Sequence, residues 1–266
     1  MPDALRSHVF EQLDRLTGEG RRLALAYSGG GDSHALLCFL ADWCHARDRD
    51  ALALTVDHGL RTESAAEAVL AAERAERLGL TARVLRWQGD PTGSGIQARA
   101  RIARHSLLAQ ACRDEGIDTL LTAHTLDDQA ETVWMRLAAG GGWRACAGME
   151  PLSPSPVWPE GRGIRIARPL LDIRREALRA ELAVRNETWI EDPSNEDRKF
   201  ERVRVRQKLA EFERGGFRTE RLAELAATIR CLIAAERRAA VRLAERAVHF
   251  ESWGGARLDR SLYRRA

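Results

Sequence analysis

The stretch YSGGGDSHALL, residues 27–37, decides the fold. Three glycines follow a short apolar run and stand directly before residues with the apolar spacing of a helix. A glycine-rich turn between a strand and a helix N-terminus presents free backbone N–H groups beside the positive end of the helix dipole, which favours anions. Ser28 and Ser33 add hydroxyl donors, and Asp32 is placed to bind a metal ion. The loop therefore predicts a phosphate site, with a plain glycine-rich turn as the alternative.

Two common phosphate-binding patterns are absent from the chain. The sequence contains neither G-x-x-x-x-G-K-[ST] nor G-x-G-x-x-G. These patterns mark the Walker loop and the dinucleotide-binding fingerprint, so both are excluded.

Outward from the loop, short apolar runs alternate with helical segments. The runs predict strands at residues 22–27, 51–56, 82–87 and 118–123. The segments between them predict helices at residues 33–46, 63–78, 96–113 and 127–137, the second opened by a capping box from Ser64 to Glu67. Four strand–helix units in succession predict an α/β, Rossmann-like fold, a parallel sheet with helices on both faces. Ligands of such sheets bind outside the carboxyl ends of the strands.

The alternation stops at residues 150–163, EPLSPSPVWPEGRG, which hold four of the eight prolines and predict a long surface loop. Residues 164–171 predict another short strand, and residues 174–185 another helix. From about Gly215 the chain is rich in Ala, Arg, Glu and Leu with helical periodicity and no strand signal. We expect a first domain at residues 1–214 and a small, basic helical domain at residues 215–266.

Composition favours a soluble cytoplasmic protein. The chain has 266 residues, 44% of them hydrophobic, and no apolar run of membrane-spanning length. Its first residues have the charge spacing of an amphipathic helix and not the apolar block of a signal peptide. The five cysteines form no C-x-x-C pair, which makes disulfides and zinc or iron–sulfur sites unfavourable and predicts buried free thiols. They are Cys38, Cys44, Cys112, Cys146 and Cys231.

Positive charge gathers at the C-terminal end. Residues 201–266 carry 16 Lys and Arg against 9 Asp and Glu, a net charge of +7, while the whole chain has +3. Nearly all of this charge is arginine, which suits bidentate contacts to phosphate. A bias toward arginine codons, or the solvation of helix faces, is the simpler explanation for the arginine content.

The glycine loop, Ser28-Gly-Gly-Gly-Asp-Ser33, resembles the S-G-G-x-D-S loop of the N-type ATP pyrophosphatases, the PP-loop superfamily. Five further stretches look like tRNA(Ile)-lysidine synthetase in order and spacing, and the resemblance covers roughly residues 20–210. They are VDHGLR (56–61), IQARARIARHSLL (96–108), TAHTLDDQAETVWMRL (122–137), RPLLDIRREAL (168–178) and WIEDPSNEDRKFERVRVRQKL (189–209).

The resemblance implies an adenine nucleotide alpha hydrolase-like fold and an ATP-dependent carbon–nitrogen ligase. Such an enzyme adenylates the wobble cytidine of a CAU-anticodon isoleucine tRNA at the oxygen on carbon 2. The ε-amino group of L-lysine then displaces AMP, and pyrophosphate is the other product. ATP and Mg²⁺ are the implied cofactors.

The expected site follows from the resemblance together with the predicted sheet edge. Acidic residues also suit helix starts as caps, and for Asp127 that explanation is as good as catalysis. The expected catalytic residues are Asp32, His124, Asp127, Asp128 and Glu131. The expected nucleotide-binding residues are Ser28, Gly29, Gly30, Gly31, Asp32, Ser33, Asp57 and His58, with Asp32 as metal ligand. The expected RNA-binding residues are Arg101, Arg104, Arg136, Asp192, Asn195, Arg202 and Arg206.

The chain departs from the family pattern at Ala139, where a second arginine is usual three residues after Arg136. Members of the family commonly continue into a further C-terminal domain, so a shortened chain is one interpretation. A tRNA cytidine thiolase of the same superfamily and a non-catalytic tRNA-binding protein are the alternative functions. The oligomeric state, a homodimer included, stays open, as do the lysine pocket, the catalytic base and the rejection of methionine tRNA.

Overall fold

Five parallel strands and one antiparallel edge strand form the central sheet, in a computed structural model that describes residues 2–18, 22–59, 63–89, 95–191 and 199–264. The spatial order is β3-β2-β1-β4-β6-β5. The strands are β1 (Leu23–Ala26), β2 (Ala51–Asp57), β3 (Thr81–Arg86), β4 (Thr119–Leu121), β5 (Leu152–Pro154) and β6 (Arg165–Ala167). All pairs are parallel except β5 with β6. The predicted α/β fold is confirmed.

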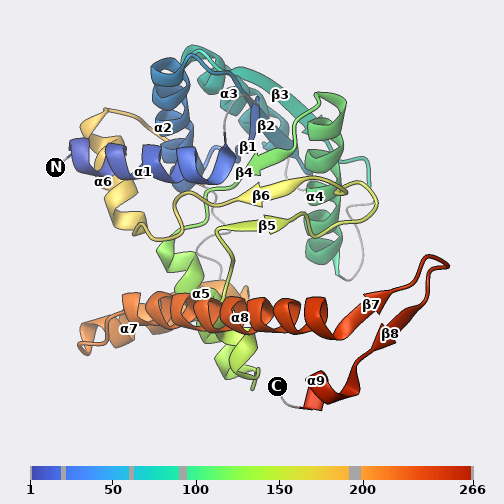
Figure 1. The fold of residues 1–266 in the computed structure, drawn as a ribbon. Coiled ribbons are helices and arrows are strands. Elements are labelled where there is room, and N and C mark those ends of the chain that lie inside the picture. The colour runs from blue at the N-terminus through green and yellow to red at the C-terminus, as the bar shows by residue number, and fades with distance from the viewer. Residues whose placement is uncertain (1, 19–21, 60–62, 90–94, 192–198, 265–266) are drawn as a thin grey trace.

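Helices cover both faces of this sheet (Figure 1). They are α1 (Pro2–Thr17), α2 (Gly31–Arg47), α3 (Ser64–Arg77), α4 (Ile96–Asp114) and α6 (Arg175–Val184). One apolar cluster joins α1, α2, α3 and α6 to the sheet, with Phe39 and Trp43 of α2 fully buried at its centre. A second cluster joins α4 to the other face through Leu108 and Cys112. Both faces of β1 are therefore buried, which explains its continuous apolar run.

A helical layer lies beside the sheet and contains α5 (Leu126–Ala138), η1 (Trp143–Ala147), α7 (Glu201–Arg214) and α8 (Glu220–Ala247). Its apolar cluster combines Ala130 and Val133 of α5 with Leu209 of α7 and Leu222 and Ile229 of α8. Apolar residues on both sides of position 215 thus share one core. The expected division into two domains at this position stays a prediction.

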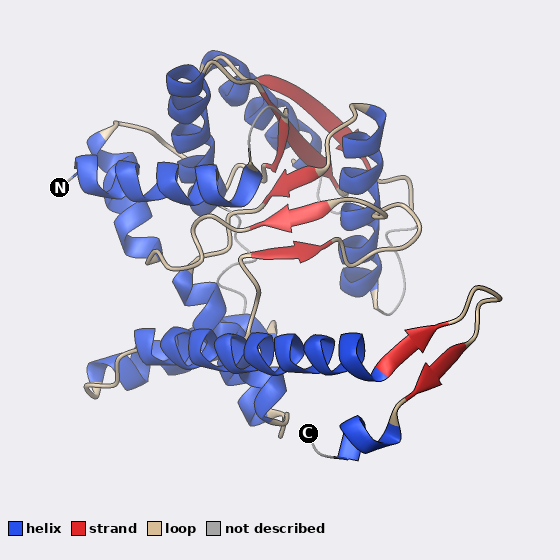
Figure 2. Ribbon diagram, in the orientation of Figure 1, coloured by secondary structure: helices blue, strands red, loops and turns tan. Residues whose placement is uncertain are grey.

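Two expectations for the loops and the C-terminal end were wrong. A hairpin of β7 (Val248–Phe250) and β8 (Ala256–Leu258) follows α8 and leads into α9 (Arg260–Arg264), where no strand was expected (Figure 2). These strands are only three residues long and largely exposed, so they give no buried apolar run. Within residues 150–163, β5 adds an edge strand that includes Pro154. Proline is tolerated there because an edge strand leaves one side of its backbone unpaired.

Ser64 does not take the expected N-cap position of α3. Glu63 is the N-cap residue of α3 and makes no side-chain cap. The hydroxyl of Ser64 donates instead to Asp57 at the end of β2, over 2.7 Å. The Ser64 hydroxyl, which the sequence pattern predicts to cap α3, therefore donates a hydrogen bond to Asp57 at the edge of the sheet.

No helix among the described residues is long and apolar enough to cross a membrane.

Candidate active site at the carboxyl edge of the sheet

The glycine loop joins β1 to α2 at the carboxyl edge of the sheet. Gly29 has a φ of +79°, a conformation that side-chain-bearing residues rarely adopt. Two serine hydroxyls brace the turn: Ser33 Oγ donates to the carbonyl of Gly30 over 2.8 Å and lies 3.0 Å from Ser28 Oγ. A side chain on Gly30 would approach nothing nearer than Ser28 Oγ, at 3.7 Å. The loop is therefore an open cradle at a helix N-terminus, as a pyrophosphate group requires.

A segment after α6, residues 187–190, lies across the back of this loop. Trp189 packs against Gly31, where a Cβ atom would stand 3.4 Å from the indole ring, and Ile190 packs against Gly29. This segment follows Asn186 and precedes residues outside the described part of the chain. Two of the expected RNA-binding residues, Asp192 and Asn195, fall in that part.

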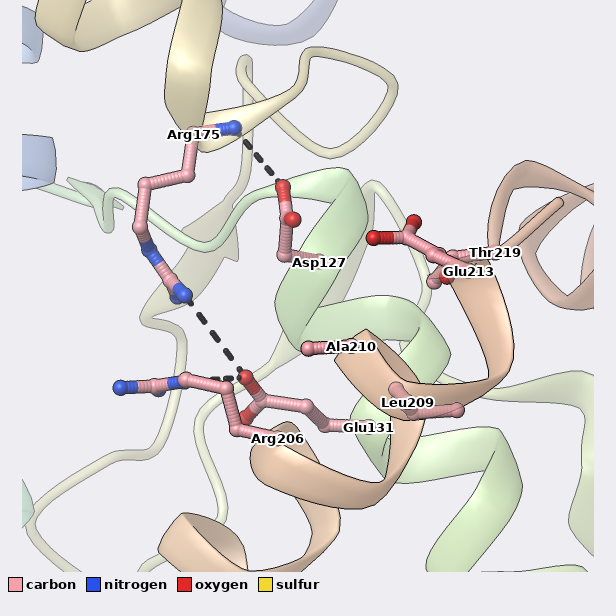
Figure 3. A pocket seen from close by; sticks show the side chains of 8 residues that line it. All are labelled: Asp127, Glu131, Arg175, Arg206, Leu209, Ala210, Glu213 and Thr219. Carbon is pink, nitrogen blue, oxygen red and sulfur yellow. Dashed lines mark hydrogen bonds and ion pairs between the residues drawn. The ribbon is translucent and has the colours of Figure 1, made fainter. Parts of the chain in front are cut away.

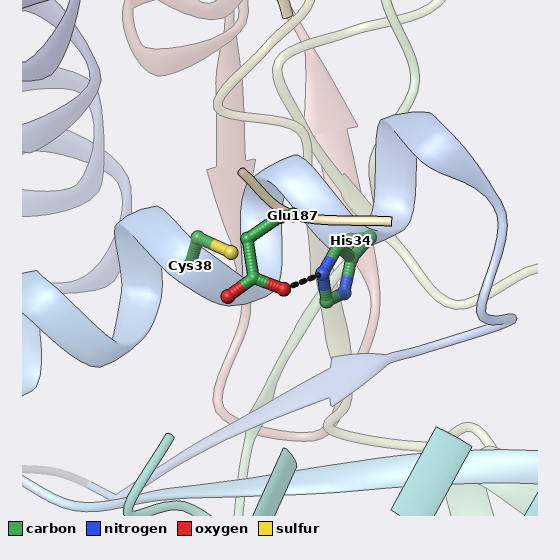
Figure 4. Close-up of side chains that lie close together, drawn as sticks. All are labelled: His34, Cys38 and Glu187. Carbon is green, nitrogen blue, oxygen red and sulfur yellow. Dashed lines mark hydrogen bonds and ion pairs between the residues drawn. The ribbon is translucent and has the colours of Figure 1, made fainter. Parts of the chain in front are cut away.

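Glu187 fastens the segment to α2 (Figure 4). Its carboxylate lies 3.0 Å from Nε2 of the fully buried His34, whose Nδ1 lies 2.9 Å from the hydroxyl of Tyr27. Cys38 lies beside them, and His34, Cys38 and Glu187 present donor atoms within 4.8 Å of one another. Burial raises the pKa of the Cys38 thiol to about 12, so the sulfur stays protonated. The hydrogen bond between His34 and Glu187 already joins two of the three donors, and the cluster is a structural clamp beneath the loop.

Four carboxylates converge beside the loop around Arg175, the first residue of α6. Figure 3 shows two of them, Asp127 and Glu131, beside Arg175. The Arg175 guanidinium donates from Nε to Asp32 over 2.8 Å and from Nη2 to Asp128 over 3.0 Å. Its Nη1 lies 3.7 Å from Glu131, and its backbone N–H donates to Asp127 over 2.7 Å. The carboxylates expected to be catalytic are therefore brought together. Arg175 itself was missed, because the sequence gives no sign that it faces Asp32.

The start of α5 explains how two adjacent aspartates differ. Thr125 is the N-cap residue, and a capping box joins it to Asp128, whose Oδ2 accepts from the Thr125 backbone N–H over 2.9 Å. Asp128 thus serves as a cap and still offers its Oδ1 to Arg175. Asp127, for which capping was the equal alternative, bonds to the backbone of Arg175 instead.

Burial and nearby positive charges have opposite effects on the pKa values of the acidic groups. Burial opposes ionisation of Asp128, but Arg175 and the Thr125 N–H outweigh it and lower the pKa of Asp128. Burial raises the pKa of Glu131, against the effect of Arg206, and also raises the pKa of Asp32, against the effect of Arg175. Glu131 Oε2 is buried without a hydrogen-bond partner among the described residues. An unpartnered carboxylate oxygen beside two aspartates fits a hard cation such as Mg²⁺.

A cavity of about 170 Å³ opens between these carboxylates and α7. Asp127, Glu131 and Glu213 give it acidic walls, and Arg175 and Arg206 line it as well. Arg206 donates to Glu131 over 2.9 Å. A small molecule that carries both a positive and a negative group fits such a lining.

Basic residues gather on the α4 side of the site. Burial lowers the pKa of Arg104, and repulsion by Arg101 and Arg202 lowers it further. Among the described residues none supplies a carboxylate to offset this charge. His105 lies in the same cluster, and both of its ring nitrogens are buried with no hydrogen-bond partner in the described part of the chain. Burial and the neighbouring arginines lower its pKa to about 4. Uncompensated arginines of this kind favour a phosphate ligand.

The remaining predicted residues occupy several places. Arg136 is held by the backbone carbonyls of Ala145 and Gly148, at 2.8 and 2.9 Å. His124 lies 3.0 Å from the Thr122 hydroxyl, and burial lowers its pKa to about 4. At the end of β2, Asp57 accepts from the backbone N–H of Gly59 and from Ser64, while burial and Arg104 lower the pKa of His58. Roles for these residues stay predictions.

The fold and the loop together define a nucleotide-binding protein of the PP-loop class. The PP-loop domain family matches residues 5–213, and the chain belongs to this family. Its curated relatives include proteins named tRNA(Ile)-lysidine synthase. That of Hyphomonas neptunium is 45% identical over 88% of this chain and 64% of its own length. Those of Mesorhizobium japonicum and Caulobacter vibrioides are each 43% identical, over 98% and 73% of this chain and 56% and 47% of their own lengths.

The chain thus spans about half to two thirds of the length of these relatives. Among solved structures, the U34-tRNA thiolase NcsA from Methanococcus maripaludis with its [4Fe-4S] cluster has a TM-score of 0.70 and 16% identity. That match covers 88% of this chain and 80% of the thiolase. At this identity the likeness concerns the fold alone.

Proposed function

We propose that this protein is a tRNA(Ile)-lysidine synthetase. The observation that carries the proposal is the meeting of Asp32 of the glycine loop with Asp128 and Glu131 of α5 on one guanidinium. In this arrangement the glycine loop lies beside the acidic cavity, which supports a nucleotide site next to an amine site. The relatives named tRNA(Ile)-lysidine synthase support the choice of substrates.

In the proposed reaction the glycine loop holds the β and γ phosphates of ATP. Backbone N–H groups of residues 29–31 and the start of α2 stabilise the charge that develops as pyrophosphate leaves. The oxygen on carbon 2 of the wobble cytidine attacks the α phosphate. Asp32 and the neighbouring carboxylates would hold Mg²⁺, which supplies charge compensation for the leaving pyrophosphate.

The acidic cavity is the proposed lysine site. Its carboxylates attract the ε-ammonium group, and Arg206 offers a partner for the lysine carboxylate. The amine must lose a proton before it attacks carbon 2 and displaces AMP. Because burial raises the pKa of Glu131, we assign the proton-accepting role to Glu131, with Asp128 as an anchor.

The uncompensated arginines are the proposed tRNA contacts. Arg101, Arg104 and Arg202 lie beside the site, where the anticodon loop must enter. Exposed arginines of α8 extend the basic surface away from it. We place the reaction in the cytoplasm.

Sulfur transfer is the second candidate, favoured only by the likeness in fold to the thiolase. The positions of the cysteines argue against sulfur transfer, because four of the five are buried and Cys231 alone is exposed. The buried cysteines are Cys38, Cys44, Cys112 and Cys146. Among the described residues, no group of metal-binding side chains contains two cysteines. A non-catalytic tRNA-binding protein would have no need for the intact Asp32 and Ser33 of the loop.

Release of AMP and pyrophosphate from ATP tests the proposal, measured with CAU-anticodon tRNA and each amino acid in turn. We expect AMP release with lysine and no other amino acid. Asp32→Asn should abolish it, whereas Asp42→Asn, on the same helix but paired with Arg185 at the surface, should not. Release with a different amino acid, or wild-type rates in Asp32→Asn, would contradict the assignment.

A further inference from the structure

One guanidinium stands where a metal ion and an ammonium group are expected to bind. Asp32 Oδ2 accepts from Arg175 Nε over 2.8 Å, and Asp128 Oδ1 accepts from Nη2 over 3.0 Å. The side chain of Arg175 is only 15% exposed, and its third nitrogen faces Glu131. Arg175 is therefore held by the same oxygen atoms that a hard divalent cation would use.

The two occupants exclude each other. A carboxylate oxygen that accepts an N–H hydrogen bond has one lone pair engaged by the guanidinium, and a divalent ion at its other lone pair would meet a fixed positive charge within a few ångströms. Coulomb repulsion at that distance is large wherever water is excluded. Asp32 and Asp128 are both shielded from bulk water, with side chains 23% and 12% exposed.

The three carboxylates of Asp32, Asp128 and Glu131 lie so close together that a neighbouring positive charge is needed to offset their repulsion. Without Arg175, the carboxylates Asp32, Asp128 and Glu131 would lie together beside an acidic cavity. Arg206 would remain bonded to Glu131, and the charge of Arg179 would still act on Asp32. Clustered carboxylates of this kind repel one another and would take up protons or recruit metal ions. Arg175 supplies a positive charge that balances these carboxylates. Its backbone N–H donates a hydrogen bond to Asp127, which holds the backbone of Arg175 in place.

We propose that Arg175 is an internal counter-cation that occupies the carboxylate cluster before substrates arrive and must be displaced for a divalent cation to bind at Asp32. The triphosphate of ATP is the natural new partner, since guanidinium groups bind phosphate oxygens in bidentate fashion. Metal binding is then weak in the nucleotide-free protein and becomes strong only when phosphate oxygens have drawn the arginine away. Arg175 thus acts as a positioning residue that orders the arrival of nucleotide and metal.

The inference rests on the proposed function in one point, the placement of the metal at Asp32. The test uses Mn²⁺ alone, without nucleotide or tRNA, and follows the signal of free Mn²⁺ by electron paramagnetic resonance. Arg175→Gln should bind Mn²⁺ more tightly than the wild type by about tenfold or more, the scale on which one neighbouring charge shifts an ionic equilibrium. Arg174→Gln is the matched control, because Arg174 contacts Asp127, Glu213 and Glu220 and none of the three carboxylates in question. Its Mn²⁺ affinity should equal that of the wild type.

A measurement on the wild type covers the case in which Arg175→Gln does not fold. The Nε–H resonance of Arg175, identified by its loss in Arg175→Lys, should shift and exchange faster with solvent as Mg²⁺ is added. An unchanged Mn²⁺ affinity in Arg175→Gln, or an Arg175 resonance that does not move while Mg²⁺ binds, overturns the proposal. Failure of the proposed function would appear elsewhere, as the absence of lysine-dependent AMP release by the wild type.

Discussion

The backbone N–H of Ile190 donates a hydrogen bond of 2.9 Å to the carbonyl of Gly29. This bond joins the segment after α6 to the glycine loop, two parts of the chain that are far apart in sequence. The Ile190 side chain fills the space behind the loop, so that a Cβ atom on Gly29 would stand only 2.7 Å from its Cδ1. The loop is thus shaped by packing from behind as well as by its own glycines.

Gly29→Ala should therefore destabilise the protein. Alanine at a φ of +79° is strained, and its methyl group must displace Ile190, at a combined cost of about 2 kcal/mol or more. Gly30→Ala is the control, since its φ is −72° and its methyl group would make only an ordinary contact with Ser28 Oγ, at 3.7 Å. Urea unfolding of both variants without ATP checks this. Equal free energies of unfolding would contradict the described contact.

His105 should make the protein sensitive to mild acid. Its pKa is about 4 in the folded protein, against an ordinary value of 6.5 for histidine, so between these values the unfolded chain binds a proton that the folded protein excludes. The His105 contribution is intact above pH 6.5 and is lost as the pH falls toward 4. His105→Gln should flatten the decline of unfolding free energy over that window, and His45→Gln, which alters an exposed residue, should leave the decline unchanged. A slope as steep as that of the wild type in His105→Gln would argue against a buried neutral imidazole.

A variant with all five cysteines replaced by alanine should keep its turnover. No step of the proposed reaction uses a thiol, and burial raises the pKa of Cys38 and Cys112 to about 12 and that of Cys44 to about 11. Circular dichroism establishes that the variant folds, and tRNA modification is then measured at saturating ATP and lysine. Loss of turnover in a folded variant would return sulfur chemistry to consideration.

Exposed arginines of α8 should contribute to tRNA affinity. The basic C-terminal residues cannot be tested cleanly by deletion after Gly215, because Leu222, Ala226 and Ile229 of α8 cover Ala130 and Val133 of α5. Neutralising Arg237, Arg238 and Arg242 to glutamine keeps that packing, since all three are exposed.

The triple variant should bind tRNA more weakly, with a salt dependence reduced by roughly 0.7–0.9 per lost phosphate contact. Filter binding at several salt concentrations measures both quantities. Arg6, Arg15 and Arg47 of α1 and α2, changed to glutamine together, form the control. Unchanged affinity and slope in the α8 variant would move the RNA contacts to Arg101, Arg104 and Arg202.

Local patterns predicted most of the sheet because β1, β2 and β4 are buried and their apolar runs are continuous. They could not reveal the hairpin after α8, whose short exposed strands are defined by pairing with each other. Likewise, β5 forms because it pairs with β6, whereas its proline, Pro154, taken alone favours a loop.

The carboxylates of the candidate site could be predicted because they belong to short continuous motifs in the sequence. Asp32, Asp127 and Asp128 lie in the first turns of helices that the sequence marks, and Glu131 lies one turn further along α5. Parallel strands bring such helix starts to one edge. Arg175 and Glu187 were not predictable from the residues. Their roles depend on how α6 and the following turn pack onto α2 and α5, and many other arginines of this chain have the same local appearance.

Helix α5 belongs to two assemblies at once. Its first turn carries Asp127 and Asp128 at the sheet edge, and its later turns supply Ala130 and Val133 to the core shared with α8. A helix of this length, 13 residues, spans about 20 Å as a stiff rod. A chimeric protein in which the residues after 215 come from a relative would therefore pack foreign side chains against α5. We expect this change to shift α5 and with it Asp127 and Asp128. A workable graft must carry α5 and the helices that grip it as one piece.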